Sequence, residues 1–285
     1  MLAGLTLAWG FNWTAMKVAL SEVAPWTFRS LCLGLGSAVL FAVLRAGGQS
    51  LAIPKGQRAR LAMLAFFNIT CWNLLIAFGM TMIPSGRAAI LAYMMPVWAI
   101  PLSVWLLGER ITGAKLAGLA FGLAGLALLL GEGIATLGSA PLGSLLVLGA
   151  SLTWALGSVL QKRYPVGMPA GPYTAWIMLL GGLPVFAGAL LFDDFRSLGG
   201  VGFWPALGIA YNVLIAFAWA HWAWIKIATA VPVSVFSLSM LIIPVVGVIS
   251  GMLFLGERPS WVEFAALGLV LVSLLTVMRP ARQAR

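Results

Sequence analysis

Apolar residues run along the whole chain in long stretches, and polar residues and helix breakers fall between them. A helix that crosses the hydrocarbon core of a bilayer needs about 20 predominantly apolar residues. Gly and Pro turn signals such as Ala24-Pro25 and Arg258-Pro259 separate the stretches. The pattern therefore predicts an all-α membrane protein with ten transmembrane helices. Their expected ranges are 2–20, 26–44, 61–83, 85–107, 112–130, 141–162, 172–192, 203–228, 233–255 and 260–278.

One of these stretches occurs twice in the chain. Residues 93–110 read YMMPVWAIPLSVWLLGER, and residues 241–258 read LIIPVVGVISGMLFLGER. From Pro96 and Pro244 onward, six of fifteen positions are identical at a fixed offset of 148 residues. A repeat of this kind indicates two copies of one structural unit. We assign the first unit to residues 1–135 and the second to residues 136–285.

Each copy holds five predicted spans, and five is an odd number. The second copy must therefore enter the membrane from the opposite face, so the repeats are expected to be inverted. The first spans of the two copies support the pairing, because the spacing from Trp9 to Lys17 recurs from Trp154 to Lys162. Inverted repeats are a recurrent design of transporters, which bind substrate near the midplane between the halves. Channels share the same device.

Composition and charge agree with a membrane location. The chain is 62% hydrophobic and only 8% charged, whereas soluble domains carry about 25% charged residues. With the N-terminus inside, twelve Lys and Arg residues fall on the inner face and five on the outer face, which predicts cytoplasmic termini in a bacterial inner membrane. The net charge of +10 thus reflects topology rather than nucleic-acid binding. The inner set is Arg45, Lys55, Arg58, Arg60, Arg110, Lys115, Lys162, Arg163, Lys226, Arg279, Arg282 and Arg285, and the outer set is Lys17, Arg29, Arg87, Arg196 and Arg258.

Several classes of protein are disfavoured by the residues available. One histidine and two cysteines, Cys32 and Cys71, are too few for an ordinary metal site or a disulfide framework. The sequence lacks a phosphate-binding GxxxxGK[ST] loop. A membrane enzyme would need paired acids or an activated nucleophile within the spans, and none stands out. We therefore expect no metal, no cofactor and no enzymatic activity. The sequence does not decide between a monomer and a homo-oligomer.

The ten spans, the two five-span repeats and the fourth and ninth spans that each carry P-x(11)-GER resemble the drug/metabolite transporter superfamily, EamA type. Within that superfamily, the Trp-rich spans make the chain most similar to the YddG-like exporters of aromatic amino acids. The resemblance covers the whole chain. It implies a basket of helices in which spans one to four and six to nine surround a central cavity, with spans five and ten at the periphery.

Polar and aromatic side chains inside hydrocarbon are expensive and are often functional. The first span places Trp9, Trp13 and Met16 at helical spacing, with Asn12 beside them. Other readings compete: Trp also forms interfacial belts, Ser bonds its own helix backbone, and His221 can serve packing alone. The candidate substrate-binding residues are Trp9, Asn12, Trp13, Asn73, Tyr93, Trp98, Trp154, Ser158, His221 and Ser237.

Proline and charged residues near the span ends suggest moving or capping parts. Pro96, Pro101 and Pro244 remove backbone hydrogen bonds within spans, so they are candidate hinge or gating residues. The two Gly-Glu-Arg motifs fall at the membrane edges, and each Glu is expected near the start of the next helix, where a negative charge is favoured. Glycines of the fifth span, such as Gly118 and Gly122, are suited to close helix contact.

These observations predict a secondary transporter of small amphipathic solutes, most of all an exporter of aromatic amino acids that works by alternating access. Aromatic walls would bury the substrate ring, and Asn12, Asn73 and His221 would hold its polar end. The alternatives are a multidrug or nucleoside exporter of the same fold, and a channel.

Overall fold

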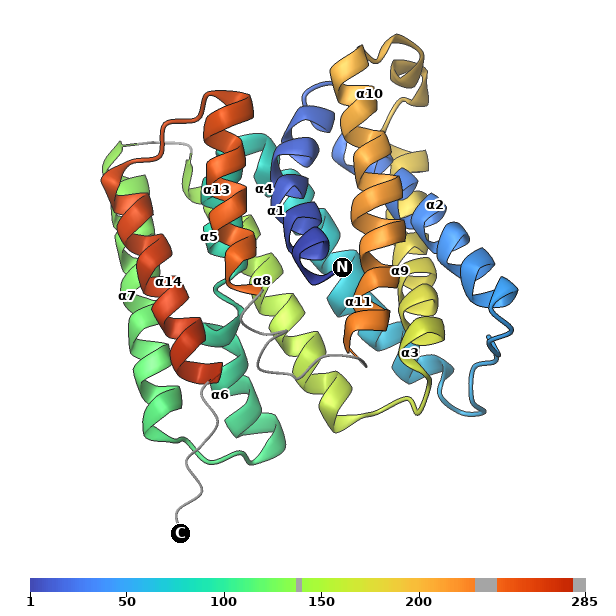
Figure 1. Cartoon of the computed structure of the whole chain (residues 1–285), viewed down its shortest axis with the longest axis horizontal. Coiled ribbons are helices and arrows are strands. Elements are labelled where there is room, and N and C mark those ends of the chain that lie inside the picture. Colours follow the sequence, from blue (N-terminus) through green and yellow to red (C-terminus); the bar gives the residue numbers. More distant parts are fainter. Residues whose placement is uncertain (137–139, 229–239, 279–285) are drawn as a thin grey trace.

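The computed structural model is a bundle of helices in the residues that it describes, which are 1–136, 140–228 and 240–278 (Figure 1). The first half holds α1 (Leu2–Ala19), α2 (Pro25–Ala46), α3 (Arg58–Ala65), η1 (Phe66–Cys71), α4 (Trp72–Met82), α5 (Ser85–Ala92), α6 (Met95–Leu107) and α7 (Gly113–Thr136). The second half holds α8 (Ala140–Arg163), α9 (Ala170–Phe192), η2 (Phe195–Gly200), α10 (Phe203–Ala210), η3 (Tyr211–Trp219), α11 (Ala220–Ala228), α13 (Ile242–Leu255) and α14 (Trp261–Met278).

Eight helical stretches of the described chain are long and apolar enough to cross a membrane. They match the predicted spans except for the first and the ninth. The first span forms α1, which has 18 residues but includes Asn12 and Lys17, and it is not among the eight. In the ninth span, α13 is a shorter apolar helix, and residues 229–239, which include its expected start, lie outside the described residues. The count of ten spans therefore stays a prediction.

The Gly-Glu-Arg motifs end helices in the same way at both sites. Gly108 after α6 and Gly256 after α13 adopt left-handed conformations, with φ of 67° and 65°. The amide of Glu109 donates to the carbonyl of Ser103 (3.3 Å), and the amide of Glu257 donates to the carbonyl of Gly251 (3.2 Å). The two donors and the two acceptors are each 148 residues apart, which is the offset of the sequence repeat. A glycine is favoured here because left-handed backbone strains residues that carry a Cβ.

Spans three and eight each contain a π-helical segment, a feature that the sequence did not predict. In span three, η1 separates α3 from α4, and in span eight, η3 separates α10 from α11. Adding 148 to the bounds of η1 gives 214–219, which lies within η3. Segments of π-helix widen the helix, weaken its regular hydrogen bonding and are frequent at functional sites.

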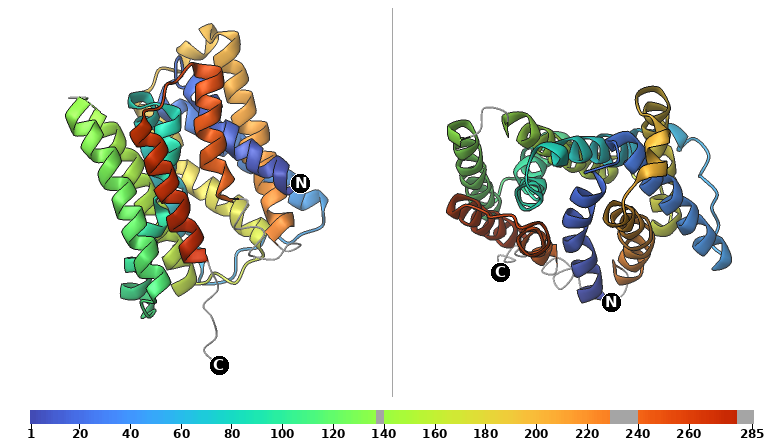
Figure 2. Two further views of the ribbon diagram at one scale, coloured as in Figure 1. Left: turned by 60° about the vertical axis from the view of Figure 1, so that its left-hand side comes forward. Right: turned by 90° about the horizontal axis from the view of Figure 1, so that it is seen from above.

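Most of the extensive packing joins the two halves of the chain (Figures 1 and 2). The α2 helix packs on α9, and α7 packs on α14. The α1 helix lies against α13 and also against α10 and η3, while α8 lies against α6, α4 and η1. The partners of the two helices correspond in the repeat: α1 contacts spans nine and eight, and α8 contacts the matching spans four and three.

The glycines of α7 allow close contact with α14, as predicted. A Cβ at Gly118 would come within 2.4 Å of Val277 Cγ2, and a Cβ at Gly125 would lie 3.3 Å from the Ala266 carbonyl oxygen. Ser273 Oγ donates to the Gly118 carbonyl at 2.6 Å. Small residues thus let two apolar helices approach along their length.

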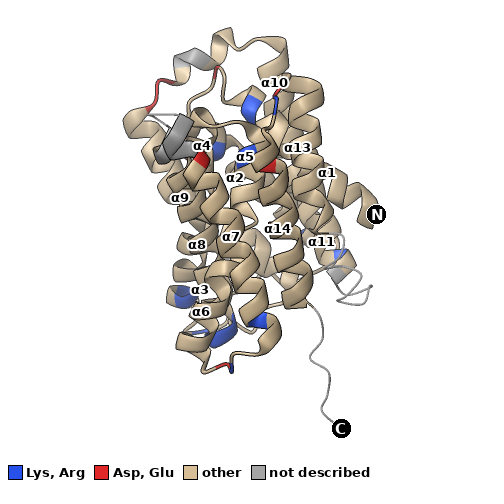
Figure 3. Cartoon of the chain, turned by 90° about the vertical axis from the view of Figure 1, so that its left-hand side faces the viewer, with Lys and Arg blue, Asp and Glu red and all other residues tan. Residues whose placement is uncertain are grey.

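Charged residues gather toward the two ends of the bundle (Figure 3). We call the end at which α1 and α13 finish the upper end, and the end at which α6 and α8 finish the lower end, as they appear in Figure 1. Arg87 near the upper end joins three helices, because it lies 3.4 Å from Glu132 of α7 and 3.9 Å from Glu263 of α14.

Candidate functional site

The first aromatic cluster lies where α1 meets span eight. Trp9 Nε1 donates to the Ala216 carbonyl inside η3 at 3.2 Å. Its ring meets His221 edge-on with a centroid distance of 5.7 Å, and it lies 5.3 Å from the ring of Trp224. His221 also stacks on Phe217 at 5.6 Å. We call Trp9, Phe217, His221 and Trp224 the span-one cluster.

The π-helix explains how His221 and the indole of Trp9 find the same acceptor. His221 Nδ1 lies 3.1 Å from the Ala216 carbonyl oxygen, which also accepts from Trp9. In a π-helix the carbonyls are spaced for bonds five residues apart, so local irregularity leaves acceptors open to side chains. The polar edge of the cluster therefore uses a backbone carbonyl whose acceptor, in a regular α-helix, would serve the hydrogen bonds of that helix.

A second aromatic cluster lies at the corresponding place in the other half, between α4, α6 and α8. The rings of Trp72 and Trp154 are 4.9 Å apart. Trp98 of α6 donates from Nε1 to Ser151 Oγ of α8 at 2.8 Å. Trp154 occupies the position that matches Trp9 in the sequence repeat. The structure thus gives both matched tryptophans partners from neighbouring spans.

The other predicted residues of the first and third spans are divided among different neighbours. Trp13 is buried against Gly247 of α13, where a Cβ would come within 3.0 Å of its ring. Asn12 is half-buried, and its Oδ1 has no hydrogen-bond partner among the described residues. Asn73 is buried and donates to the Ile69 carbonyl of η1 at 2.9 Å.

The remaining candidates lie outside the two clusters. Ser158 is exposed, and its hydroxyl donates to its own helix at Trp154 O (2.8 Å). Tyr93 lies at the break between α5 and α6. Ser237 falls outside the described residues. Of the prolines, Pro96 stands in the first turn of α6 beside that break, Pro101 is exposed within α6, and Pro244 is buried in the first turn of α13.

A charged clamp holds the upper end together. Lys17 at the end of α1 donates from Nζ to the carbonyls of Met80 (2.5 Å) and Ile83 (2.8 Å), where α4 ends. The Glu257 carboxylate accepts from the amides of Ser85 (2.6 Å) and Gly86 (3.0 Å), where α5 begins. The two charges thus complement the dipoles of two adjoining helix ends. We call these contacts the upper clamp.

The clamp corrects the expectation for Glu257. Its carboxylate caps α5 in the other half of the chain and not α14, the next helix along. The start of α14 has its own reciprocal cap, in which Ser260 Oγ accepts from the Glu263 amide (3.2 Å) and Glu263 Oε2 accepts from the Ser260 amide (3.1 Å).

The matching glutamate at the lower end binds side chains instead. Glu109 accepts from Lys115 Nζ at 2.8 Å and from Lys162 Nζ at 2.5 Å. Hydrogen bonds from the two ammonium groups lower the pKa of Glu109 from 4.5 to about 2. A depressed carboxyl pKa contributes stability above the unfolded value and loses it as the pH falls toward the folded value.

We expect a pH dependence of stability that is specific to Glu109. Glu109→Gln should lower the free energy of unfolding at pH 7 by about 1 kcal/mol or less, because the pair is near the surface and water screens it. The difference between wild type and variant should persist above pH 5 and shrink between about pH 4.5 and 2. Thermal unfolding in detergent across this range measures it, and a difference that grows toward low pH would contradict the assignment.

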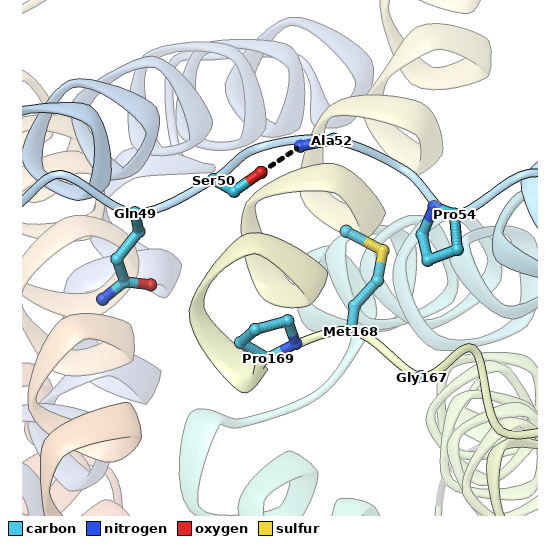
Figure 4. Close-up of a pocket in the computed structure, with 7 residues that line it drawn as sticks. All are labelled: Gln49, Ser50, Ala52, Pro54, Gly167, Met168 and Pro169. Atoms are coloured by element: carbon cyan, nitrogen blue, oxygen red, sulfur yellow. Dashed lines mark hydrogen bonds between the residues drawn. The ribbon is translucent and has the colours of Figure 1, made fainter.

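A surface pocket of about 400 Å³ lies away from both clusters, between the α2–α3 and α8–α9 loops (Figure 4). The Ala52 amide donates to Ser50 Oγ there at 3.4 Å. No charged side chain lines the pocket, and none of the predicted site residues belongs to it. Its lining residues are Gln49, Ser50, Ala52, Pro54, Gly167, Met168 and Pro169.

Comparison with known families gives the chain its class. The family model described as "EamA-like transporter family" matches the sequence at residues 1–131 and again at residues 141–279. The chain belongs to the EamA-like transporter family. It is therefore a multi-pass membrane transporter and not an enzyme.

Curated relatives of this EamA protein span nearly its whole length. An uncharacterized transporter, YoaV of Bacillus subtilis, is 26% identical over 90% of this chain and 88% of its own. An uncharacterized transporter of Archaeoglobus fulgidus is 28% identical over 98% of each chain. A probable amino-acid metabolite efflux pump of Escherichia coli is 25% identical over 95% of this chain and 91% of its own.

The fold of this EamA protein also has a solved counterpart. A crystal structure with 22% sequence identity superimposes with a TM-score of 0.68, and the match covers 96% of this chain and 93% of the other. The likeness confirms the helical fold.

Some residues of the EamA protein that stand at the clusters were not predicted as site residues. Phe217 belongs to the span-one cluster, but a lone Phe in an apolar span has no sequence signal. Trp72 pairs with Trp154, and its Trp-Asn neighbourhood in the third span was a usable signal. Arg29 was counted only as an outer charge, although it is 2% exposed.

Proposed function

We propose that this protein is a secondary transporter that exports small amphipathic metabolites, above all aromatic amino acids, across a bacterial inner membrane by alternating access. The observation that carries the proposal is the span-one cluster. It places aromatic faces, an imidazole and a carbonyl that accepts from a side chain together within two membrane spans. Such a surface suits a solute with a flat apolar ring and a polar end.

Three features support the proposed arrangement of two inverted five-helix repeats. The family model matches the chain twice. The π-helical segments and the left-handed glycines recur at the offset of the sequence repeat. The helix contacts keep their pattern when the halves are exchanged. With five spans per copy, we propose ten spans in two oppositely oriented halves around a central cavity, and the bias of Lys and Arg toward one face favours cytoplasmic termini.

Alternating access then assigns roles to the two ends. The upper clamp ties α1 and the Glu257 loop to the junction of α4 and α5, so it closes the outer side. At the lower end, Glu109 and Lys162 bind each other. Export requires the upper contacts to break once solute has entered from the cytoplasm, and Pro96 and Pro244 lie where a hinge would serve.

The decisive experiment is counterflow in proteoliposomes. Vesicles loaded with unlabelled phenylalanine should accumulate labelled phenylalanine, and the uptake should saturate and be competed by tyrosine and tryptophan. His221→Ala should lower the uptake about 10-fold, which corresponds to the loss of about 1.4 kcal/mol. Competition by adenosine and not by amino acids would favour a multidrug or nucleoside exporter, and flux that does not saturate would favour a channel.

A further inference from the structure

Arg29 is a buried cation on α2, about one turn into the span. Its side chain is 2% exposed. A guanidinium carries five N–H donors, yet the hydrogen bond that the structure gives this one runs from Nη2 to the thioether sulfur of Met16, at 2.7 Å. The Nε donor has no partner within the described part of the chain. A thioether is a weak acceptor, so most of the donor capacity of Arg29 is unused.

In the described part of the chain, no carboxylate lies within ion-pair distance of this charge. Its nearest charge-stabilising groups are aromatic faces, because the guanidinium carbon lies 5.1 Å from the ring centre of Phe28 and 5.9 Å from that of Phe217. A buried charge without a counter-charge is costly and destabilises the fold. A charged residue kept at that cost within a membrane span points to a function.

The position of Arg29 joins it to the span-one cluster. Phe217, whose ring lies near the guanidinium, also stacks on His221 at 5.6 Å. His221 in turn meets Trp9. A solute that rests its ring among these aromatic side chains would therefore have a cation beside it, one ring away from the histidine.

Two buried amide oxygens complete the surroundings. Asn12 lies one helical turn before Met16 on α1, and Asn212 in η3 is fully buried. The Oδ1 atoms of both lack a hydrogen-bond donor among the described residues. Their helices lie side by side, since a Cβ at Gly208, one turn before Asn212, would come within 2.6 Å of the Ala15 carbonyl oxygen. Asn212 thus lies in the span that packs on α1, and Asn12 lies one turn before Met16, the partner of Arg29.

We propose that Arg29 binds the carboxylate of the substrate, and that Asn12 and Asn212 accept hydrogen bonds from its ammonium group. The substrate class is then α-amino acids with aromatic or large apolar side chains. The Met16 thioether occupies the guanidinium until substrate binds. The carboxylate then displaces it, because a methionine side chain changes conformation readily. A guanidinium binds a carboxylate with two parallel hydrogen bonds, which a thioether cannot match. The inference rests on the proposed transport function and specifies its substrate.

Substrate analogues test the assignment in wild-type proteoliposomes. We compare competition against labelled phenylalanine by 3-phenylpropionate, which lacks the ammonium group, and by phenethylamine, which lacks the carboxylate. Both should compete at least about 10-fold more weakly than phenylalanine, because charge-assisted hydrogen bonds are lost. Phenethylamine that competes as well as phenylalanine would overturn the role of Arg29 and leave the transport function standing. Failure of wild-type protein to transport any amino acid would instead overturn the proposed function.

Variants separate a binding role from a packing role. Arg29→Met keeps the volume and removes the uncompensated charge, so it should unfold at the same or a higher temperature than wild type while the KM for phenylalanine rises about 10-fold or more. Arg29→Lys should keep part of the affinity, since it keeps the charge but loses the bidentate geometry. Arg45→Met, at the exposed end of the same helix, is the matched control. An Arg29→Met protein that is folded and transports with the wild-type KM would refute the proposal.

Discussion

Glu257→Ala is expected to open the upper end of the bundle, the end that we propose faces outward, and to slow transport about 10-fold. The Glu257 carboxylate occupies the amides of Ser85 and Gly86 at the start of α5. A carboxylate at a helix start is worth about 0.5–2 kcal/mol. Since about 1.4 kcal/mol changes an equilibrium tenfold, this one contact can decide which end of an alternating-access protein is closed.

Labelling of a buried position measures the effect directly. Ala89 on α5 is fully buried and faces Gly247 of α13, so a cysteine there should react slowly with an impermeant thiol reagent while the upper clamp is closed. The native Cys32 and Cys71 are first replaced by alanine. In this background Glu257→Ala should speed the labelling about 10-fold, and Glu257→Gln, which keeps an acceptor, should have a smaller effect.

Glu22→Ala is the matched control for this variant. Glu22 also accepts from a helix-start amide, that of Gly202 at 2.7 Å, but it is exposed and lies outside the clamp. Its loss should change neither the labelling nor the flux. Equal labelling rates in the wild type and in Glu257→Ala would show that the carboxylate only stabilises α5 and does not gate the protein.

The sequence predicted features that depend on local chemistry. Eight of the predicted spans follow from apolar length, and the glycines of the repeated motif end their helices because left-handed backbone favours glycine. The glycines of span five allow α14 to approach, as expected. In each case one residue type or one run of residues is sufficient to specify the structure.

The missed features depend on which surfaces meet. Trp9 and Trp13 are four residues apart on α1, yet one packs on span eight and the other on α13, because α1 lies between these two neighbours. Glu257 caps a helix that is distant in the sequence, and Arg29 shows its missing counter-charge only after its surroundings are known. A π-helix is equally hidden, since its residues are ordinary apolar ones.

Trp9→Ala is expected to remove most transport while the protein remains folded. The side chain provides both a ring in the span-one cluster and the N–H that Ala216 accepts. Aromatic residues at the centre of a binding surface commonly contribute about 2 kcal/mol or more, so the KM should rise about 10-fold or more. Trp9→Phe keeps a ring but loses the N–H, and it should have an intermediate effect.

Trp154→Ala extends the test to the second half. If the two halves exchange roles during transport, the tryptophan that matches Trp9 should matter to a similar degree, and its ring already contacts Trp72. Trp204→Ala, which removes a largely exposed tryptophan at the start of α10, is the control and should transport like wild type. Counterflow combined with thermal unfolding separates the outcomes. Loss of flux in Trp9→Ala but not in Trp154→Ala would mean that the substrate site belongs to one half, whereas wild-type flux in both would exclude the aromatic clusters as the site.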